Sequence, residues 1–452
     1  MAFPKNHSLR FDLSNEVHAR PPEPLEATSN ITCLALLTPW PYCENDRSVI
    51  EDLTRRYGAT PPGQGAKHYS VELSNFRLVW ERHTEFTRYT FITKNGAEDP
   101  FESRAIDAAP EDWVASLPGE TIAAINAVLL PDTYPLGEHA DISDRFFSGN
   151  AIVGSEITGG AAIAFADFRI HKDGFSRYLI QNRTMSAWHA GRVVQRLLEI
   201  ETYRTIAMLA LPLAQRLSEK ASAWESDLSE VTSVMRDASV ADEPDLLNRL
   251  TSLQSAIEHS YAESQFRFSA ADAYYALVQR RIGELREERI KGLQTFGEFT
   301  QRRLAPAIST CTSIAKRQHA LSERVDRAAQ LLSTRVNMSL EHQNQTLLET
   351  MNHRADLQMR LQQTVEGISV AAITYYVVGV FGYILAALHK AGLPFDVTIA
   401  KGVLAPVVFA VAAFGVWRIR RSVEKKSESV PLHLIFQRRD RADNGLEEAA
   451  DR

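Results

Sequence analysis

Cysteine is scarce in this chain, and positive charge is not in excess. The 452 residues include three cysteines, Cys33, Cys43 and Cys311, and the formal net charge is −6. An odd number of cysteines at these separations forms neither a disulfide framework nor a zinc motif, which is typical of a reducing compartment. The chain also lacks a Lys/Arg-rich stripe interleaved with aromatic residues, so we expect no nucleic-acid partner.

Recognisable enzyme motifs are absent as well. The chain has no nucleophile elbow and no kinase set. Gly159-Gly160 predicts a turn between strands, because neither a GxGxxG spacing nor a Lys-Ser/Thr pair follows it. We therefore expect no catalytic residue, no cofactor and no metal ion, and the protein is not expected to be an enzyme.

Two long apolar stretches occur near the C-terminus, at residues 368–388 and 402–417. The first carries no charged residue, and as a helix it would be about 30 Å long, enough to cross the core of a bilayer. The second reaches 19 residues when 399–401 are included, with Lys401 extended towards the interface. The pair predicts transmembrane helices at 368–389 and 399–417, joined by an extracytoplasmic loop at 390–398, with lipid as a partner.

The charges around these stretches predict their orientation. The loop between them offers only Lys390 and Lys401, whereas five positive charges follow the second stretch: Arg418, Arg420, Arg421, Lys425 and Lys426. Because cytoplasmic flanks are enriched in Lys and Arg, the tail at 418–452 is expected in the cytoplasm. Residues 1–20 lack the apolar run of a signal peptide. We expect a multi-pass protein of the bacterial inner membrane with both termini cytoplasmic.

The N-terminal region has the pattern of a mixed α+β domain, residues 1–181. After an extended leading segment rich in proline, β-branched and aromatic residues predict strands at 31–37, 69–73, 76–92, 151–157, 161–170 and 175–181. Helices are expected at 105–116 and 121–130. Asp173-Gly174 predicts a type I′ hairpin turn between the last two strands.

Helical periodicity begins after residue 182. Apolar spacing predicts a helix over 184–219, kinked or ended by Pro212, and further helices at 224–238, 244–261 and 266–299. These segments are amphipathic, so we expect an antiparallel helical layer over 182–305.

A very long stalk helix is expected next, at 306–367. Residues 307–366 contain neither Gly nor Pro, and one continuous helix over them would be about 90 Å long. Its apolar residues recur in steps of three and four, like an interrupted coiled-coil seam. A helix of this length needs partners, either the preceding helices or other copies of the chain, so a homo-oligomer is expected.

Three stretches resemble an uncharacterised bacterial family of membrane-anchored proteins, the domain of unknown function 3422 family. They are Leu-Ser-Asn-Glu-Val-His-Ala-Arg-Pro at 13–21, Trp-Glu-Arg-His-Thr-Glu-Phe at 80–86 and Gly-Arg-Val-Val-Gln-Arg-Leu-Leu-Glu-Ile-Glu-Thr-Tyr at 191–203. The resemblance spans nearly the whole chain. It implies location and architecture, and it supplies no activity, substrate or catalytic residue.

The order of the parts also resembles the CorA family of divalent-cation channels, which are pentamers. That family carries a Gly-Met-Asn tripeptide at the outer end of its first span, but residues 385–393 here are Leu-Ala-Ala-Leu-His-Lys-Ala-Gly-Leu. At the mouth of such a channel Lys390 would repel a dication, and Asp396 is the only acidic residue of the loop. These departures argue against selection of hydrated magnesium.

Two groups of residues are candidate sites. In the first apolar stretch Tyr375, Gly379, Gly382 and Ala386 share a helix face, with Tyr383 supplying a further polar atom, and this face predicts helix packing or the lining of a narrow conduit. Small residues favour packing, and the stretch has no ionisable residue of the kind that marks an ion relay.

The second group consists of polar residues in the N-terminal domain. His83 and Glu85, beside Glu81, would share one side of a strand and could bind a metal or perform acid–base chemistry, although such charges often lie on a solvated face. His18 and Arg20 before Pro21 could bind an anion or pin the N-terminal segment to the domain. The favoured function is a CorA-like membrane protein in ion transport or transmembrane sensing; the alternative is a non-conducting anchor or scaffold that binds an unknown ion, ligand or partner.

Overall fold

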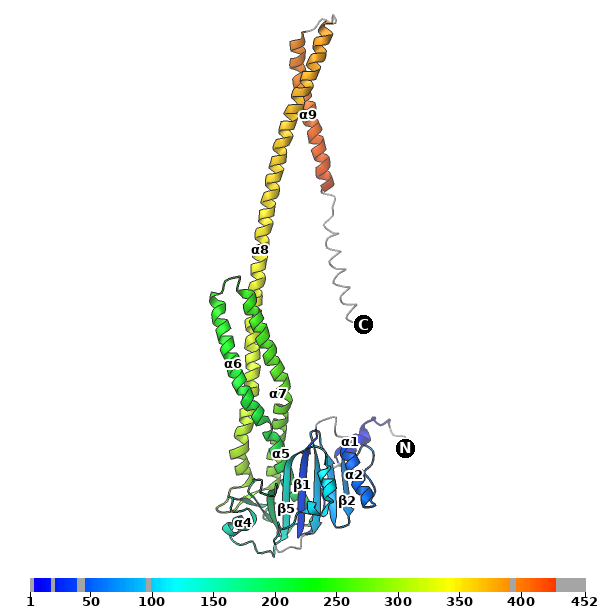
Figure 1. The fold of residues 1–452 in the computed structure, drawn as a ribbon, viewed down its shortest axis with the longest axis vertical. Coiled ribbons are helices and arrows are strands. Elements are labelled where there is room, and N and C mark those ends of the chain that lie inside the picture. The colour runs from blue at the N-terminus through cyan, green and yellow to red at the C-terminus, as the bar shows by residue number, and fades with distance from the viewer. Residues whose placement is uncertain (1–3, 18–20, 39–44, 95–98, 391–395, 428–452) are drawn as a thin grey trace. The chain divides into compact units, whose positions relative to one another are not determined.

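The computed structural model describes residues 4–17, 21–38, 45–94, 99–390 and 396–427 (Figure 1). The chain divides into two compact units, residues 1–334 and 335–452, and the boundary falls within helix α8 (Phe296–Lys390). Unit 1 contains a nine-stranded sheet with helices. The described part of unit 2 consists of the remainder of α8 and helix α9 (Val397–Ser427). The predicted α+β class is confirmed, as are the helical layer, the very long helix and the final apolar helix.

The sheet of unit 1 is mixed. Its strand order is β2-β3-β4-β1-β5-β8-β7-β6-β9, and every neighbouring pair is antiparallel except β5 and β8. The strands are β1 (Ser29–Leu37), β2 (His68–Leu73), β3 (Phe76–Arg82), β4 (Phe86–Lys94), β5 (Glu120–Pro131), β6 (Val153–Ile157), β7 (Ala162–Ala166), β8 (Ser176–Asn182) and β9 (Glu288–Arg289).

The expected helix at 121–130 is wrong, because this segment is the central strand β5. Its alanines favour a helix by intrinsic propensity, but β5 pairs with β1 on one side and with β8 on the other. Residues 125–130 are buried without alternation, since both faces of the sheet are covered. Tertiary pairing therefore decides the conformation of β5.

Helices cover both faces of the sheet. On one face Cys33, Ile125 and Tyr178 join a core that includes α5 (Ala187–Met208), α7 (Glu243–Leu285) and the first turns of α8. On the other face Trp80 and Phe91 pack with α2 (Asn45–Arg56), the short helix η2 (Ala105–Ala108) and α3 (Glu111–Ala115). A third core involves α4 (His139–Phe146). The two-sided burial fixes which side chains of β3 and β4 face α5.

The turn between β7 and β8 contains the predicted Asp-Gly dipeptide, but it is not of type I′. Gly174 has a positive φ of 86°, whereas Asp173 is not in the left-handed region. The Gly174 amide donates to the carbonyl of His171 at 2.9 Å. A single left-handed glycine after the turn closes this hairpin, as in three-residue hairpin loops.

The helical layer differs in its boundaries from the prediction. α5 ends at Met208, and α6 (Ala210–Asp237) follows with Pro212 in its first turn, where a missing N–H is tolerated. The expected helix at 266–299 is interrupted, because Arg286 adopts a φ of 50° after α7 and β9 follows. α8 then begins at Phe296 rather than at residue 306. In the leading segment, residues Arg10–Val17 form helix α1 instead of extended chain.

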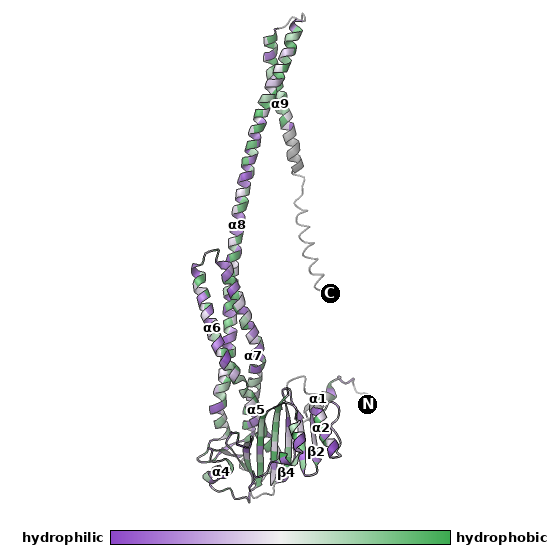
Figure 2. Ribbon diagram, in the orientation of Figure 1, coloured by the Kyte–Doolittle hydropathy of each residue, from purple (hydrophilic) through white to green (hydrophobic). Residues whose placement is uncertain are grey.

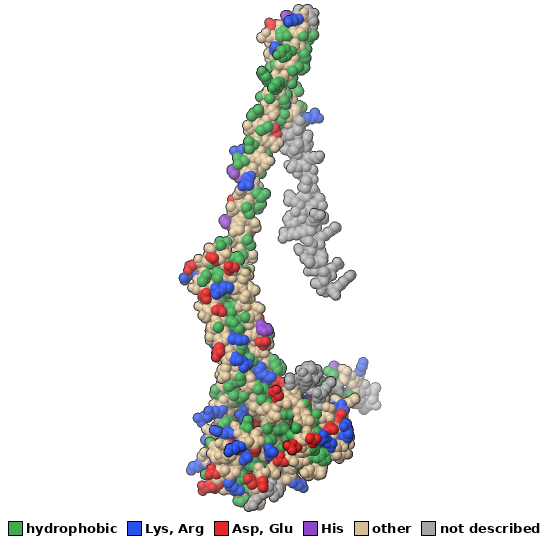
Figure 3. All heavy atoms as spheres, viewed as in Figure 1, with side chains coloured by type: hydrophobic (Ala, Val, Ile, Leu, Met, Phe, Trp, Pro, Cys, Tyr) green, Lys and Arg blue, Asp and Glu red, His purple; other side chains and the backbone are tan. Residues whose placement is uncertain are grey.

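Hydropathy is distributed unevenly along α8 and α9. The later part of α8 and most of α9 are hydrophobic (Figure 2), and charged side chains are dense over unit 1 but sparse along these apolar parts (Figure 3). By length and composition, α8 and the segment 397–418 can each cross a membrane.

Candidate functional site

The structure places His83 and Glu85 in the turn between β3 and β4, not at alternate positions of a strand. The ring of His83 stacks on Phe86 with centroids 4.2 Å apart. The carboxylate of Glu85 instead pairs with Arg267 of α7 at 2.9 Å. Over the described ranges, no cluster of three or more His, Cys, Asp or Glu side chains could hold a metal ion. His83 and Glu85 therefore make separate contacts and do not form a joint site.

Glu81, by contrast, belongs to a buried charge cluster. Arg88 of β4 donates from Nε to Glu81 Oε2 of β3 at 2.6 Å, and both side chains are at most 5% exposed. Arg88 Nη2 also lies 3.8 Å from Glu199 Oε1 of α5. Glu199 in turn accepts from Nε of Arg281 on α7. Four elements thus contribute alternating charges to one continuous cluster.

The cluster extends towards the surface through Glu284. This carboxylate accepts from Arg281 at 3.0 Å and from Arg196 of α5 at 2.9 Å. Three arginines therefore meet three glutamates, and the formal charges balance. Buried charges are tolerated only when they are paired and hydrogen-bonded in this way.

The electrostatics of the cluster stabilise its ionised form. Burial opposes the charge of Arg88, but Glu81 and Glu199 outweigh it and hold the pKa of Arg88 above its ordinary value. Burial also raises the pKa of the neighbouring Cys33 thiol to about 11 and that of Tyr203 to about 12. Because a nucleophilic cysteine must be a thiolate, Cys33 is unreactive at neutral pH. These groups are arranged for structure rather than for proton transfer.

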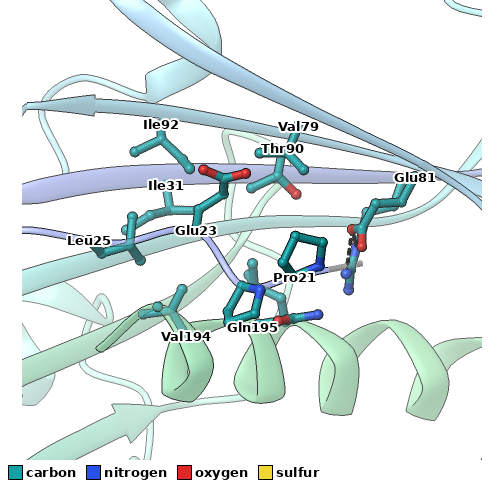
Figure 4. Close-up of a pocket in the computed structure, with 14 residues that line it drawn as sticks. Pro21, Glu23, Leu25, Ile31, Val79, Glu81, Thr90, Ile92, Val194 and Gln195 are labelled. Atoms are coloured by element: carbon teal, nitrogen blue, oxygen red, sulfur yellow. Dashed lines mark hydrogen bonds and ion pairs between the residues drawn. The ribbon is translucent and has the colours of Figure 1, made fainter. Parts of the chain in front are cut away.

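A small cavity lies beside the cluster, between the sheet, α5 and the segment that precedes β1. Its volume is about 40 Å³, and Pro21, Glu23, Glu81, Arg88 and Gln195 are among the residues that line it (Figure 4). Arg88 Nη1 has no hydrogen-bond partner among the described atoms. A cavity of this size holds one or two water molecules. Water in this cavity can therefore hydrogen-bond the guanidinium of Arg88, but the cavity is too small for an organic ligand.

Residues 21–25 form the wall of this cavity, and we call them the N-terminal strap. The amide of Leu25 donates to the carbonyl of Ala187 in the first turn of α5 at 3.0 Å. Glu23 pairs with Arg77 of β3 at 3.0 Å. Gly191 of α5 lies directly under the carbonyl of Glu23, and a Cβ at this position would overlap it. The absence of a side chain at residue 191 lets the strap lie against the helix.

The three stretches quoted for the family resemblance meet at this point. The first supplies Pro21, the second supplies Glu81, and the third supplies Gly191 and Glu199. Sequence reasoning singled out Glu81 but missed Arg88, Glu199 and Arg281. The sequence offered one signal for this cluster, which is the position of Glu199 among the apolar residues of the predicted 184–219 helix. His18 and Arg20 directly precede the strap but lie outside the described residues.

The five residues of the predicted packing or conduit face on α8 differ in their surroundings. Tyr375 and Tyr383 are 76% and 82% exposed, and the space around Gly379 is open. Gly382 is buried against the side chain of Lys401 on α9, and Ala386 is half-buried. The five residues therefore do not share one environment.

The predicted mouth residues lie at the two helix ends. Lys390 is the last residue of α8. The Asp396 carboxylate accepts from the amides of Thr398 and Ile399 at 2.8 and 3.4 Å, so it caps the start of α9. These hydrogen bonds explain the position of Asp396 without an ion.

These features define an α+β protein with a buried, charge-balanced cluster and two helices apolar enough to cross a membrane. The chain belongs to the family described as "Protein of unknown function (DUF3422)", whose model matches residues 5–423. The predicted family is thus confirmed, whereas the resemblance to CorA channels is not confirmed by this match. A comparison with curated proteins finds no significant match.

Proposed function

We propose that this protein is a non-catalytic membrane anchor or scaffold that holds a binding domain at the cytoplasmic face of the bacterial inner membrane. The observation that carries this proposal is α8 itself. This helix contributes Phe296 and Leu304 to the core of unit 1, and it also contains the apolar stretch at 368–388. One helix thus contributes residues both to the core of the domain and to the proposed anchor.

The charge distribution supports the proposed topology. Lys390 ends the first apolar helix and Lys401 lies near the start of the second, whereas the five positive charges follow the second apolar stretch, towards the end of α9. On the positive-inside rule this arrangement gives cytoplasmic termini. The candidate site favours a structural role over a chemical one, since its charges are paired and its cavity accepts only water.

Membrane integration is tested with charge insertions in the full chain. Val380→Arg and Phe381→Arg each place a cation within the first apolar stretch, at a cost of about 2.5 to 3.5 kcal/mol at the centre of a span. We expect the wild-type protein to resist extraction by alkaline carbonate and the double variant to be extracted. Gln362→Arg, on the same helix before the stretch, serves as the control. Extraction of the wild type would contradict the proposal.

Topology and conduction need separate measurements. In a Cys43→Ser background, His389→Cys should react with an impermeant maleimide from outside intact spheroplasts, and Ser422→Cys only after lysis. Purified protein in liposomes should pass neither monovalent nor divalent cations. A reproducible cation flux would replace the anchor with the transport function.

A further inference from the structure

The part of α8 in unit 2 carries an apolar face that no described residue covers. Every residue from Leu340 to Val365 is exposed. Eight large apolar side chains between residues 347 and 368 are 49 to 67% exposed: Leu347, Leu348, Met351, Leu357, Met359, Leu361, Val365 and Ile368. A contiguous exposed apolar surface of this extent marks an interaction site.

Five of these residues, Leu347, Met351, Leu361, Val365 and Ile368, lie in one heptad register. Steps of four and three alternate without a break through residues 340, 344, 347, 351, 354, 358, 361, 365, 368, 372, 375 and 379. We call this row the α8 seam. An alternating step of this kind averages 3.5 residues, the period at which helices of different chains wind around each other.

Charge is partitioned around the seam. Between residues 344 and 371 the charged side chains Glu349, Asp356, Arg360 and Glu366 lie at positions that face away from it. Arg354 is the one charge within it. The flanking positions carry Leu348, Leu357 and uncharged residues, so the face is wider than a narrow two-residue stripe. A wide face that carries a single charge requires cover from another apolar helix surface of similar length.

The only described helix beside this part of α8 does not cover the seam. α9 runs along the apolar stretch of α8, where Lys401 lies against Gly382 (Figure 1). Val370, on the side of α8 away from the seam, is 8% exposed, whereas Tyr375 in the seam is 76% exposed. The seam is therefore open through Gly379 and ends where Lys401 crosses the helix.

We infer that the α8 seam is a homotypic interface, occupied by the same seam of further copies of this chain in parallel and in register. The parallel orientation rests on the proposed function, because copies anchored in one membrane enter it from the same side. In register, Asn344 and Gln358 each meet their own counterparts and can hydrogen-bond within the seam. Polar layers of this kind specify register in coiled coils.

The interface is tested by cysteine cross-linking of the full chain in native membranes. The background is Cys43→Ser, since Cys33 and Cys311 are buried. Leu361→Cys lies in the seam, and Gln363→Cys lies on the opposite face two residues away. Under mild oxidation we expect roughly tenfold more disulfide-linked dimer from Leu361→Cys, because disulfides demand close Cβ atoms. Equal cross-linking of the two variants, or none from either, would overturn the inference.

A second measurement tests association without disulfide formation. Light scattering of the purified wild type should give a multiple of the chain mass, and the combined substitution Leu347→Glu and Leu361→Glu should give one chain mass. Arg360→Glu, on the outer face, should leave the multiple unchanged. A monomeric wild type, or an adduct with a different protein at residue 361, would refute the homotypic interface. Cross-linking that survives in a carbonate-soluble protein would instead refute the membrane anchor and retain the seam.

Discussion

The backbone carbonyl of Glu23 lies directly over Gly191, so that a single missing side chain on α5 holds the N-terminal strap in place. The strap is separated from α5 by more than 160 residues of chain, and the hydrogen bond from Leu25 to Ala187 fixes it one turn earlier on the helix. The segment directly after the first stretch of the family resemblance thus meets the third stretch in one backbone contact.

Gly191→Ala should release the strap. The added methyl group overlaps the Glu23 carbonyl, and overpacking of this kind costs about 1 to 3 kcal/mol. We expect a lower unfolding temperature and faster proteolysis of the segment before β1. Gly283→Ala on α7 is the matched control, since nothing lies within 4 Å of its added Cβ. Unchanged proteolysis of Gly191→Ala would show that the strap does not depend on this contact.

Arg88→Met should destabilise unit 1 strongly. It leaves Glu81 and one oxygen of Glu199 without their buried partner, and breaking a buried pair from one side costs about 3 to 5 kcal/mol. Urea unfolding measures the loss. Arg55→Met, on the exposed face of α2, should change stability by no more than about 0.5 kcal/mol. Equal effects of the two substitutions would remove the cluster as a source of stability.

The fall in the free energy of unfolding at alkaline pH should depend in part on the Cys33 thiol. Its pKa is raised by burial from the ordinary value of 9.0 to about 11, so the folded state keeps the thiol proton longer than the unfolded state does. The contribution is fully present below pH 9 and is lost as pH rises through 11, by about 2 to 3 kcal/mol. Urea unfolding of Cys33→Ala between pH 8 and 11 should show a shallower decline. An identical slope would assign the decline to other groups.

Arg354→Leu should strengthen association through the α8 seam. The arginine places like charges in one layer of the inferred interface, and its replacement buries an apolar side chain worth roughly 1.5 to 3 kcal/mol. Dilution of the detergent-solubilised protein, followed by light scattering, measures dissociation. Arg360→Leu on the outer face should leave dissociation unchanged, and tighter association of both variants would point to non-specific hydrophobic contact.

The elements with strong local patterns could be predicted from the sequence. β-branched and aromatic runs located β1, β3, β4 and β8, and the absence of Gly and Pro over 307–366 predicted a continuous helix. β5 could not be predicted in this way, because its alanine content favours a helix and its strand conformation depends on two partners distant in the chain.

The candidate site was harder to predict than the fold. The His83–Glu85 hypothesis assumed a strand where the chain turns, and a shift of this kind changes which side chains share a face. Arg281 and Glu199 are 82 positions apart, and no local pattern connects them. Only the packing of α7 on α5 brings the two charges together.

The placement of α8 also sets the order of events during synthesis. The core of unit 1 is incomplete until Phe296, Leu304 and Ile308 have been made, and the helical core ends with Leu332. The first apolar stretch begins at residue 368, only 36 residues after 332. At 5 to 20 residues per second the interval is about 2 to 7 s. The core of unit 1 is therefore complete in sequence only shortly before the first apolar stretch is made, and under the proposed anchoring a nascent chain reaches the membrane with a domain that has only just closed.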